Sequence, residues 1–275
     1  MSNIILCYYL WMNILNSVIL GLVQGLTEFL PVSSSGHLII ARQLLGIQTT
    51  DGLAFDAVLQ LATIAAVGVY FFKDLLRLAK TFILMVRGKV VEAKEKTLLW
   101  AIILGTIPAV IFGVLLESKM ETIFRNVHLV ALTLFLGSIM MFLAEKYARQ
   151  NDSLTIQKGF LTGMFQTLAL VPGISRSGAT ISGGLFLGLK REDATRFSFL
   201  LSFPVILGSG LKKLYDLYKV HEIATLGSPL WIGSAVAFVV GLFAIHFLVS
   251  YLKKHTLNIF IFYRLLVVAL ILILF

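Results

Sequence analysis

Two apolar segments of the chain, residues 14–48 and 159–189, are each interrupted mid-way by proline, glycine and serine. The interruptions fall at residues 31–36 and 172–178. Proline inside an apolar run works against one continuous helix. Non-helical backbone at membrane depth is tolerated only where it is buried in protein or lines a wet cavity. Each segment is therefore predicted to form two half-helices that meet at a polar tip, as in a re-entrant hairpin.

The composition places these segments in a membrane. Of 275 residues, 58% are hydrophobic and 13% are charged, whereas soluble domains carry about 25% charged residues. The remaining apolar runs are long enough to span a bilayer. They are residues 54–72, 98–116, 128–145, 197–211, 230–250 and 257–275. The sequence predicts an all-α polytopic membrane protein, with one integral membrane domain over residues 1–275.

The N-terminal residues and the cysteine content exclude other classes. Residues 1–13 lack the basic region that opens a signal peptide, so they are expected to belong to the mature protein. Cys7 is the one cysteine in the sequence. An intramolecular disulfide and a cysteine-based metal site are therefore excluded.

The two halves of the chain repeat at an offset of 142 residues without gaps. Leucines match by chance in a chain this rich in apolar residues, so the evidence for the repeat is the set of matching polar residues and glycines. They are Gly21/Gly163, Gln24/Gln166, Ser33/Ser175, Ser35/Ser177 and Gly36/Gly178. Each half, about 14–148 and 156–275, then holds one broken hairpin and three spans. Because three is odd, the second half must enter the membrane upside down, which predicts an inverted repeat with a site near the midplane.

The basic residues of the chain lie mainly on one face of this arrangement. Residues 73–97, 146–158, 190–196 and 251–256 are predicted loops on that face, and they hold most of the Lys and Arg. The positive-inside rule places this face in the cytoplasm and the mouth of the first hairpin outside. The rule also explains the net charge of +9 without a nucleic-acid partner. The basic residues at 87–96 are expected to contact anionic membrane lipids.

The first tip, residues 24–37, gathers an amide, an acid, hydroxyls and a histidine in an apolar segment. Burying polar groups at membrane depth costs free energy, so their presence in this segment indicates a functional site. Gln24 and Glu28 are four residues apart and share a helical face. A carboxylate and an amide oxygen there suit a hard divalent cation that phosphate completes. The alternative is a polar pair that only bonds the neighbouring hairpin.

Three serines begin the helix that is predicted after Pro31. Serine is a favoured N-cap, and the free N–H groups of a helix start bind phosphate. His37 follows Ser33 and Ser34 by one helical turn, so it is a candidate base, acid or nucleophile beside a nucleophilic serine. The alternatives are serines that only cap the helix and a histidine that only packs.

The second tip contributes Arg176 within residues 172–180. A guanidinium matches phosphate oxygens in a fork geometry and keeps its charge. The alternative is a structural ion pair between Arg176 and Glu28, which is compatible with phosphate binding. Together the two tips indicate a site for a phosphate-bearing lipid. Arg264, in the last predicted span, lacks an obvious partner in the sequence, and its role stays open between structure and function.

The two tips resemble the two signatures of the bacitracin-resistance (BacA/UppP) family of undecaprenyl-diphosphate phosphatases. The strings are QGLTEFLPVSSSGHL at 24–38 and PGISRSGATISGG at 172–184, and the resemblance runs end to end. It implies hydrolysis of undecaprenyl diphosphate to the monophosphate and inorganic phosphate in the bacterial inner membrane, with the active site outside. This reaction recycles the lipid carrier for peptidoglycan and other cell-wall polymers. Bacitracin sequesters the diphosphate, so it is a partner only through the substrate.

The resemblance also implies roles for individual residues. Glu28 and Gln24 would bind a divalent cation, Mg²⁺ or Ca²⁺, although Gln24 offers no charge. Ser34 is the candidate nucleophile, and His37 assists or itself attacks. Arg176 would hold the diphosphate. The expected supporting and substrate-binding hydroxyls are those of Ser33, Ser35, Ser175, Ser177 and Thr180.

Three other classes of protein share some of these features. A polyprenyl-phosphate flippase or transporter is the main alternative, because inverted repeats with broken helices are typical of transporters. A type-2 phosphatidic-acid phosphatase is disfavoured, since its Arg-Pro motif and its later His–Asp pair are missing. A purely structural membrane protein leaves the polar tips unexplained. The sequence leaves open a homodimer, the tail-length preference, the physiological cation and the choice between Ser34 and His37 as nucleophile.

Overall fold

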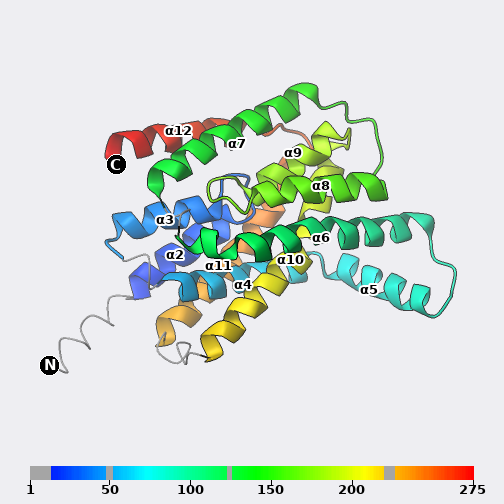
Figure 1. Ribbon diagram of the computed structural model, residues 1–275, viewed down its shortest axis with the longest axis horizontal. Coiled ribbons are helices and arrows are strands. Elements are labelled where there is room, and N and C mark those ends of the chain that lie inside the picture. The colour runs from blue at the N-terminus through cyan, green and yellow to red at the C-terminus, as the bar shows by residue number, and fades with distance from the viewer. Residues whose placement is uncertain (1–13, 48–51, 123–125, 220–226) are drawn as a thin grey trace.

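The computed structural model describes residues 14–47, 52–122, 126–219 and 227–275. Residues 1–13, which were expected to belong to the mature protein, lie outside the described residues. The described chain is helical apart from short connections and one isolated bridge between Asp152 and Leu189 (Figure 1). The helices are α2 (Ile14–Thr27), α3 (Ser34–Leu44), α4 (Gly52–Tyr70), α5 (Phe72–Val86), α6 (Ala93–Thr122), α7 (Val127–Tyr147), α8 (Ile156–Leu168), α9 (Arg176–Phe186), α10 (Arg191–Lys219), α11 (Gly227–Tyr251) and α12 (Asn258–Leu274). The predicted all-α class is therefore confirmed.

The long helices make this a multi-pass membrane protein. Within the described residues, four helical stretches are long and apolar enough to cross a bilayer. They are Ala93–Leu116, Val127–Tyr147, Arg191–Asp216 and Gly227–Tyr251. The other two predicted spans correspond to α4 and α12, which are apolar but shorter. The run predicted at 197–211 is extended in α10, because the polar residues that flank the apolar window continue the helix.

The segment at 73–97 is not the simple loop that was predicted. It contains α5, which bends by 79° from α4. The error came from reading Lys73, Arg77 and Lys80 as loop charges. Leu78 and Thr81 are buried, whereas Lys73, Arg77 and Lys80 are exposed, so α5 has a buried face and an exposed, charged face. In Figure 1, α5 lies beside the first part of α6 at one end of the molecule.

Both predicted broken hairpins are present. Helices α2 and α3 are separated by residues 28–33, and α8 and α9 by residues 169–175. The matching positions take matching roles: Ser33 is the N-cap of α3, and Ser175 is the N-cap of α9. Each cap accepts a hydrogen bond from the N–H three residues later. This correspondence agrees with the predicted inverted repeat.

Each hairpin packs against a span from the other half of the chain. Helix α2 lies on α11, and α8 lies on α6. Both contacts are made by paired glycines: a Cβ on Gly21 would collide with the backbone of Gly233, and one on Gly163 with that of Gly105. Small residues allow such close approach between helices in a membrane, where packing and hydrogen bonds must replace the hydrophobic effect. The exchanged packing brings the two tips toward each other in the interior.

Aromatic packing anchors the first tip. Phe29 is fully buried, with its ring centroid 5.8 Å from that of Phe199 in α10. Phe199 in turn lies 5.6 Å from Phe71, at the bend between α4 and α5. Because Phe29 follows Glu28 directly, this cluster restrains the backbone that carries the acid.

Candidate active site

The two hairpin tips are in direct contact. The hydroxyl of Ser33 accepts a hydrogen bond from the backbone N–H of Gly173 at 3.1 Å, in addition to the one from Gly36 in its own helix. A Cβ built on Gly178 would lie 3.5 Å from the Cβ of Pro31. Gly173 has a φ of 95°, a left-handed conformation that glycine adopts at little cost. Ser33 therefore caps its own helix and also joins the two halves of the chain.

Glu28 and Arg176 form a buried ion pair between the tips. Arg176 Nη2 donates to Glu28 Oε1 at 2.7 Å, and the two side chains are 15% and 4% exposed. The other carboxylate oxygen, Oε2, accepts from the Ser34 hydroxyl at 2.6 Å and from the Gln24 amide at 3.0 Å. The predicted cluster of Gln24, Glu28, Ser34 and Arg176 is thus brought together from residues 148 positions apart.

Arg176 has spare hydrogen-bonding capacity. Its Nη1 is buried and has no hydrogen-bond partner among the described residues. The great majority of buried polar groups in proteins do have a partner. This unused donor next to a buried acid, at the start of α9, can therefore bond an acceptor such as a phosphate oxygen.

His37 makes different contacts from those expected. Its Nδ1 lies 2.8 Å from the carbonyl oxygen of Ser33, and its Nε2 lies 2.9 Å from the hydroxyl of Tyr263 in α12. A carbonyl only accepts, so Nδ1 carries the proton and Nε2 of the neutral ring accepts from Tyr263. The rings of His37 and Tyr263 are also stacked, with centroids 5.6 Å apart. The Ser34 hydroxyl is therefore hydrogen-bonded to Glu28, whereas the His37 ring is hydrogen-bonded to Tyr263.

The other predicted hydroxyls fall into two groups. Ser33 and Ser175 cap their helices, and each lies close to the hydroxyl two residues later, Ser35 at 3.3 Å and Ser177 at 3.1 Å. Thr180 instead is fully buried, where its hydroxyl donates to the Arg176 carbonyl and lies 2.5 Å from Ser198 of α10. The structure therefore directs Thr180 toward α10, one turn behind the Glu28–Arg176 pair.

Arg264 connects both tips to α7. It is completely buried, and its Nε donates to the Ser138 hydroxyl at 3.0 Å. Its Nη2 donates to the carbonyls of Leu134 at 2.9 Å and Gly173 at 3.0 Å, and its Nη1 to that of Pro31 at 3.3 Å. Sequence reasoning noticed this arginine but not its contacts. It missed Tyr263 entirely, because one tyrosine in an apolar helix carries no distinguishing pattern.

The side chains alone do not form a complete metal cage. Within the described residues, no group of three or more His, Cys, Asp or Glu side chains lies close enough to hold a metal ion. Glu28 and Gln24 are adjacent, as predicted, and both are buried. Mg²⁺ is commonly bound by one or two carboxylates together with substrate phosphates, so this donor set fits a cation that arrives with a diphosphate.

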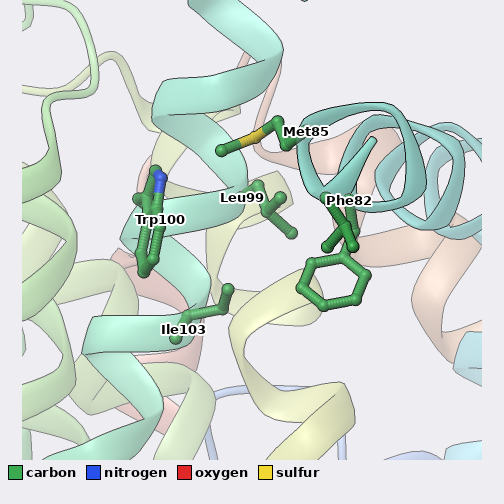
Figure 2. A pocket seen from close by; sticks show the side chains of 6 residues that line it. Phe82, Met85, Leu99, Trp100 and Ile103 are labelled. Carbon is green, nitrogen blue, oxygen red and sulfur yellow. The ribbon is translucent and has the colours of Figure 1, made fainter. Parts of the chain in front are cut away.

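A separate apolar pocket lies between α5 and α6 (Figure 2). Its volume is about 270 Å³. The lining side chains are Phe82, Met85, Val86, Leu99, Trp100 and Ile103. Such a lining offers no charged side chain to bind phosphate, so the polar tips remain the candidate site for chemistry.

Comparison with known proteins agrees with this location. A family model described as "Bacitracin resistance protein BacA" matches residues 17–270, which include both tips. The chain is 45% identical to an undecaprenyl-diphosphatase of Mycolicibacterium smegmatis, over 92% of this chain and 93% of the relative. It is 41% identical to an undecaprenyl-diphosphatase of Chlorobium phaeovibrioides, over 96% of this chain and 97% of the relative. A third undecaprenyl-diphosphatase, from Myxococcus xanthus, is 42% identical over 92% of this chain and 86% of its own. With two tips that meet in one polar site and a match that covers nearly its whole length, the chain belongs to the bacitracin resistance protein BacA family.

Proposed function

We propose that this protein hydrolyses undecaprenyl diphosphate to undecaprenyl phosphate and inorganic phosphate. The names of the three relatives give this substrate. The observation that carries the proposal to this chain is the buried Glu28–Arg176 pair between the tips, with Arg176 Nη1 left unbonded. Release of undecaprenyl phosphate returns the carrier for cell-wall synthesis and lowers the amount of diphosphate that bacitracin can sequester.

The diphosphate binds between the starts of α3 and α9. Arg176 turns part of its guanidinium from Glu28 to the phosphate oxygens, which offer a bidentate partner of higher charge. The N–H groups at the start of each helix add the positive end of a helix dipole. The isoprenoid tail stays among the lipid-facing helices. Charge that builds on the transferring phosphoryl group is thereby neutralised in a site shielded from water.

Ser34 is the nucleophile in this proposal, and Glu28 is its base. The hydroxyl already donates to Glu28 Oε2 at 2.6 Å. As its proton moves to Glu28, Ser34 Oγ bonds to the terminal phosphorus and the bond to the bridging oxygen breaks. Undecaprenyl phosphate leaves, and water then cleaves the phosphoserine to release inorganic phosphate and restore Ser34. His37, bonded to Ser33 and Tyr263, holds the first turn of α3 in place.

A divalent cation, Mg²⁺ or Ca²⁺, belongs to the proposed site. Glu28 is the carboxylate that would hold it, with the amide of Gln24 beside it, and oxygens of the diphosphate complete the donor set. When bound, the cation supplies positive charge to the phosphate oxygens. Because Glu28 is the one acid of this donor set, the cation would be held jointly by the protein and the diphosphate.

The proposed location is the bacterial inner membrane. The basic residues of α5 and of the connections after α7 and α9 lie on the cytoplasmic side by the positive-inside rule. The mouth of the first hairpin then opens to the outside, where undecaprenyl diphosphate is released during cell-wall synthesis.

Phosphate release by purified protein in detergent tests the proposed function. Wild-type protein should release phosphate from undecaprenyl diphosphate with Mg²⁺ or Ca²⁺, and a chelator should stop it. Glu28→Ala and Arg176→Ala should each abolish release. The matched control is Arg191→Ala, because Arg191 forms a similar ion pair with Glu145, at 2.6 Å and with side chains 16% and 7% exposed, away from the tips.

Each outcome of that assay has a definite meaning. The control should lose stability but keep its turnover per folded molecule. Wild-type-like release by Glu28→Ala or Arg176→Ala would refute the assigned site. Hydrolysis needs no sealed compartment, so an absence of release in detergent, together with lipid movement in vesicles, would favour the flippase alternative.

A further inference from the structure

Arg264 is a buried cation that the proposed chemistry does not use. It is fully buried, and each of its three nitrogens donates to a neutral oxygen of the protein: the Ser138 hydroxyl and the carbonyls of Leu134, Gly173 and Pro31. An ionisable residue inside a membrane protein is costly and marks a functional site by default. Its position in α12 must therefore bring a benefit that an apolar residue would not.

The tip carbonyls that accept from Arg264, those of Pro31 and Gly173, lie close in sequence to the proposed site residues. Pro31 lies three residues after Glu28, and Gly173 lies three residues before Arg176. One guanidinium thus holds the two loops that carry the acid and the arginine of the proposed site. It also fixes both loops to α7 through Leu134 and Ser138.

Two residues of α7, Gly137 and Thr133, support these contacts of Arg264. A Cβ on Gly137 would collide with the Arg264 guanidinium, so glycine makes the space on α7. One turn earlier, the Thr133 hydroxyl donates to the Pro172 carbonyl at 2.5 Å and so bonds the same loop to α7. Helix α7 is therefore a rigid support for the second tip, and Arg264 extends that support to the first.

We propose that Arg264 is a positioning residue that sets the separation of Glu28 and Arg176 by holding both hairpin tips. This inference rests on the proposed function, because it concerns the geometry of that site. Arg264 acts through the loops, since the side chain is completely buried and each of its three nitrogens donates to a protein oxygen. Lysine cannot replace it, because a single ammonium lacks the planar fork that reaches several acceptors at once.

The first test is kinetic. Arg264→Lys and Arg264→Gln should lower kcat by about 100-fold per folded molecule, the loss that a misplacement of about 1 Å produces. KM should stay close to the wild-type value, because the transition state is more sensitive to misplacement than substrate binding is. Arg191→Lys is the matched control and should keep its kcat. Unchanged kcat at a temperature where the variants are folded would overturn the inference, and so would a raised KM with normal kcat, which would indicate direct substrate contact.

The second test needs no turnover. Hydrogen–deuterium exchange should become faster in peptides that cover residues 28–36 and 170–178 of Arg264→Gln, and in both peptides together. The Arg191→Lys control should leave both peptides as in wild type. Unchanged exchange at the tips would overturn the inference even if turnover fell. If wild-type protein releases no phosphate, but Arg264→Gln still shows faster exchange in both peptides than wild type does, the proposed function is refuted and the positioning role stands.

Discussion

Removing one charge from the Glu28–Arg176 pair should destabilise the protein strongly. Glu28→Gln leaves the guanidinium of Arg176 buried without its counter-charge, since the two side chains are only 4% and 15% exposed. Breaking a buried ion pair from one side costs about 3–5 kcal/mol. Glutamine keeps one carbonyl oxygen for the three donors that now converge on Glu28, so the lower end, about 3 kcal/mol, is expected. Arg176→Gln should cost a similar amount, because it leaves the carboxylate uncompensated.

The double variant, Glu28→Gln with Arg176→Gln, measures how much of the lost stability comes from the interaction between the two charges. With both charges gone, neither group is left buried and unpaired. The loss in the double variant should therefore be smaller than the sum of the single losses, by a coupling free energy of about 2–3 kcal/mol. All three variants should lack phosphate release, so the recovered stability of the double variant would not restore activity.

Unfolding in mixed detergent micelles, followed by circular dichroism, measures this cycle. The same cycle on Glu145 and Arg191, which form the other well-buried ion pair described above, provides a matched comparison. That pair should also show coupling, but its variants should keep turnover. Additive single losses at Glu28 and Arg176 would refute the reasoning, because they would mean that the two charges do not stabilise each other.

Three further predictions test other parts of the site. Ser34→Ala should abolish both turnover and a trapped phosphoenzyme, which radiolabelled substrate and acid quenching would detect; a phosphoenzyme in that variant would move the nucleophile elsewhere. Tyr263→Phe should lower kcat about fivefold, the equivalent of one hydrogen bond of about 1 kcal/mol, and no change in kcat would exclude a role for its hydroxyl. Gly173→Ala should lower the thermal midpoint more than Gly46→Ala: both residues have positive φ, but a Cβ collides with Thr133 at Gly173 and meets nothing within 4 Å at Gly46. Equal shifts would argue against close contact between the second tip and α7.

The meeting of Glu28 and Arg176 was predictable from the sequence. Two interrupted apolar segments in one repeat must bury their polar ends, and polar groups at membrane depth need partners. The starts of α3 and α9 could also be predicted from the sequence, because serine at positions 33 and 175 is a local capping signal. These features depend on residue types that are close in sequence or on a repeat that covers the whole chain.

Other features depend on tertiary contacts that have no local signal. The bond from Tyr263 to His37 joins residues 226 positions apart, and Arg264 reaches Pro31 over 233 positions. Sequence spacing placed His37 near the serines but did not reveal that its Nδ1 would face a carbonyl. Helix α5 was missed for a different reason: its cations were counted as loop charges, although its apolar residues recur at helical spacing.

A structure with a methylene-bridged polyprenyl diphosphate, which cannot be hydrolysed at the bridge, tests the central claim most directly. The account predicts the diphosphate between the starts of α3 and α9. Arg176 Nη1 should donate to a phosphate oxygen, and Ser34 Oγ should face the terminal phosphorus. A diphosphate bound elsewhere, for example beside the pocket between α5 and α6, with Glu28 and Arg176 still paired only to each other, would contradict it.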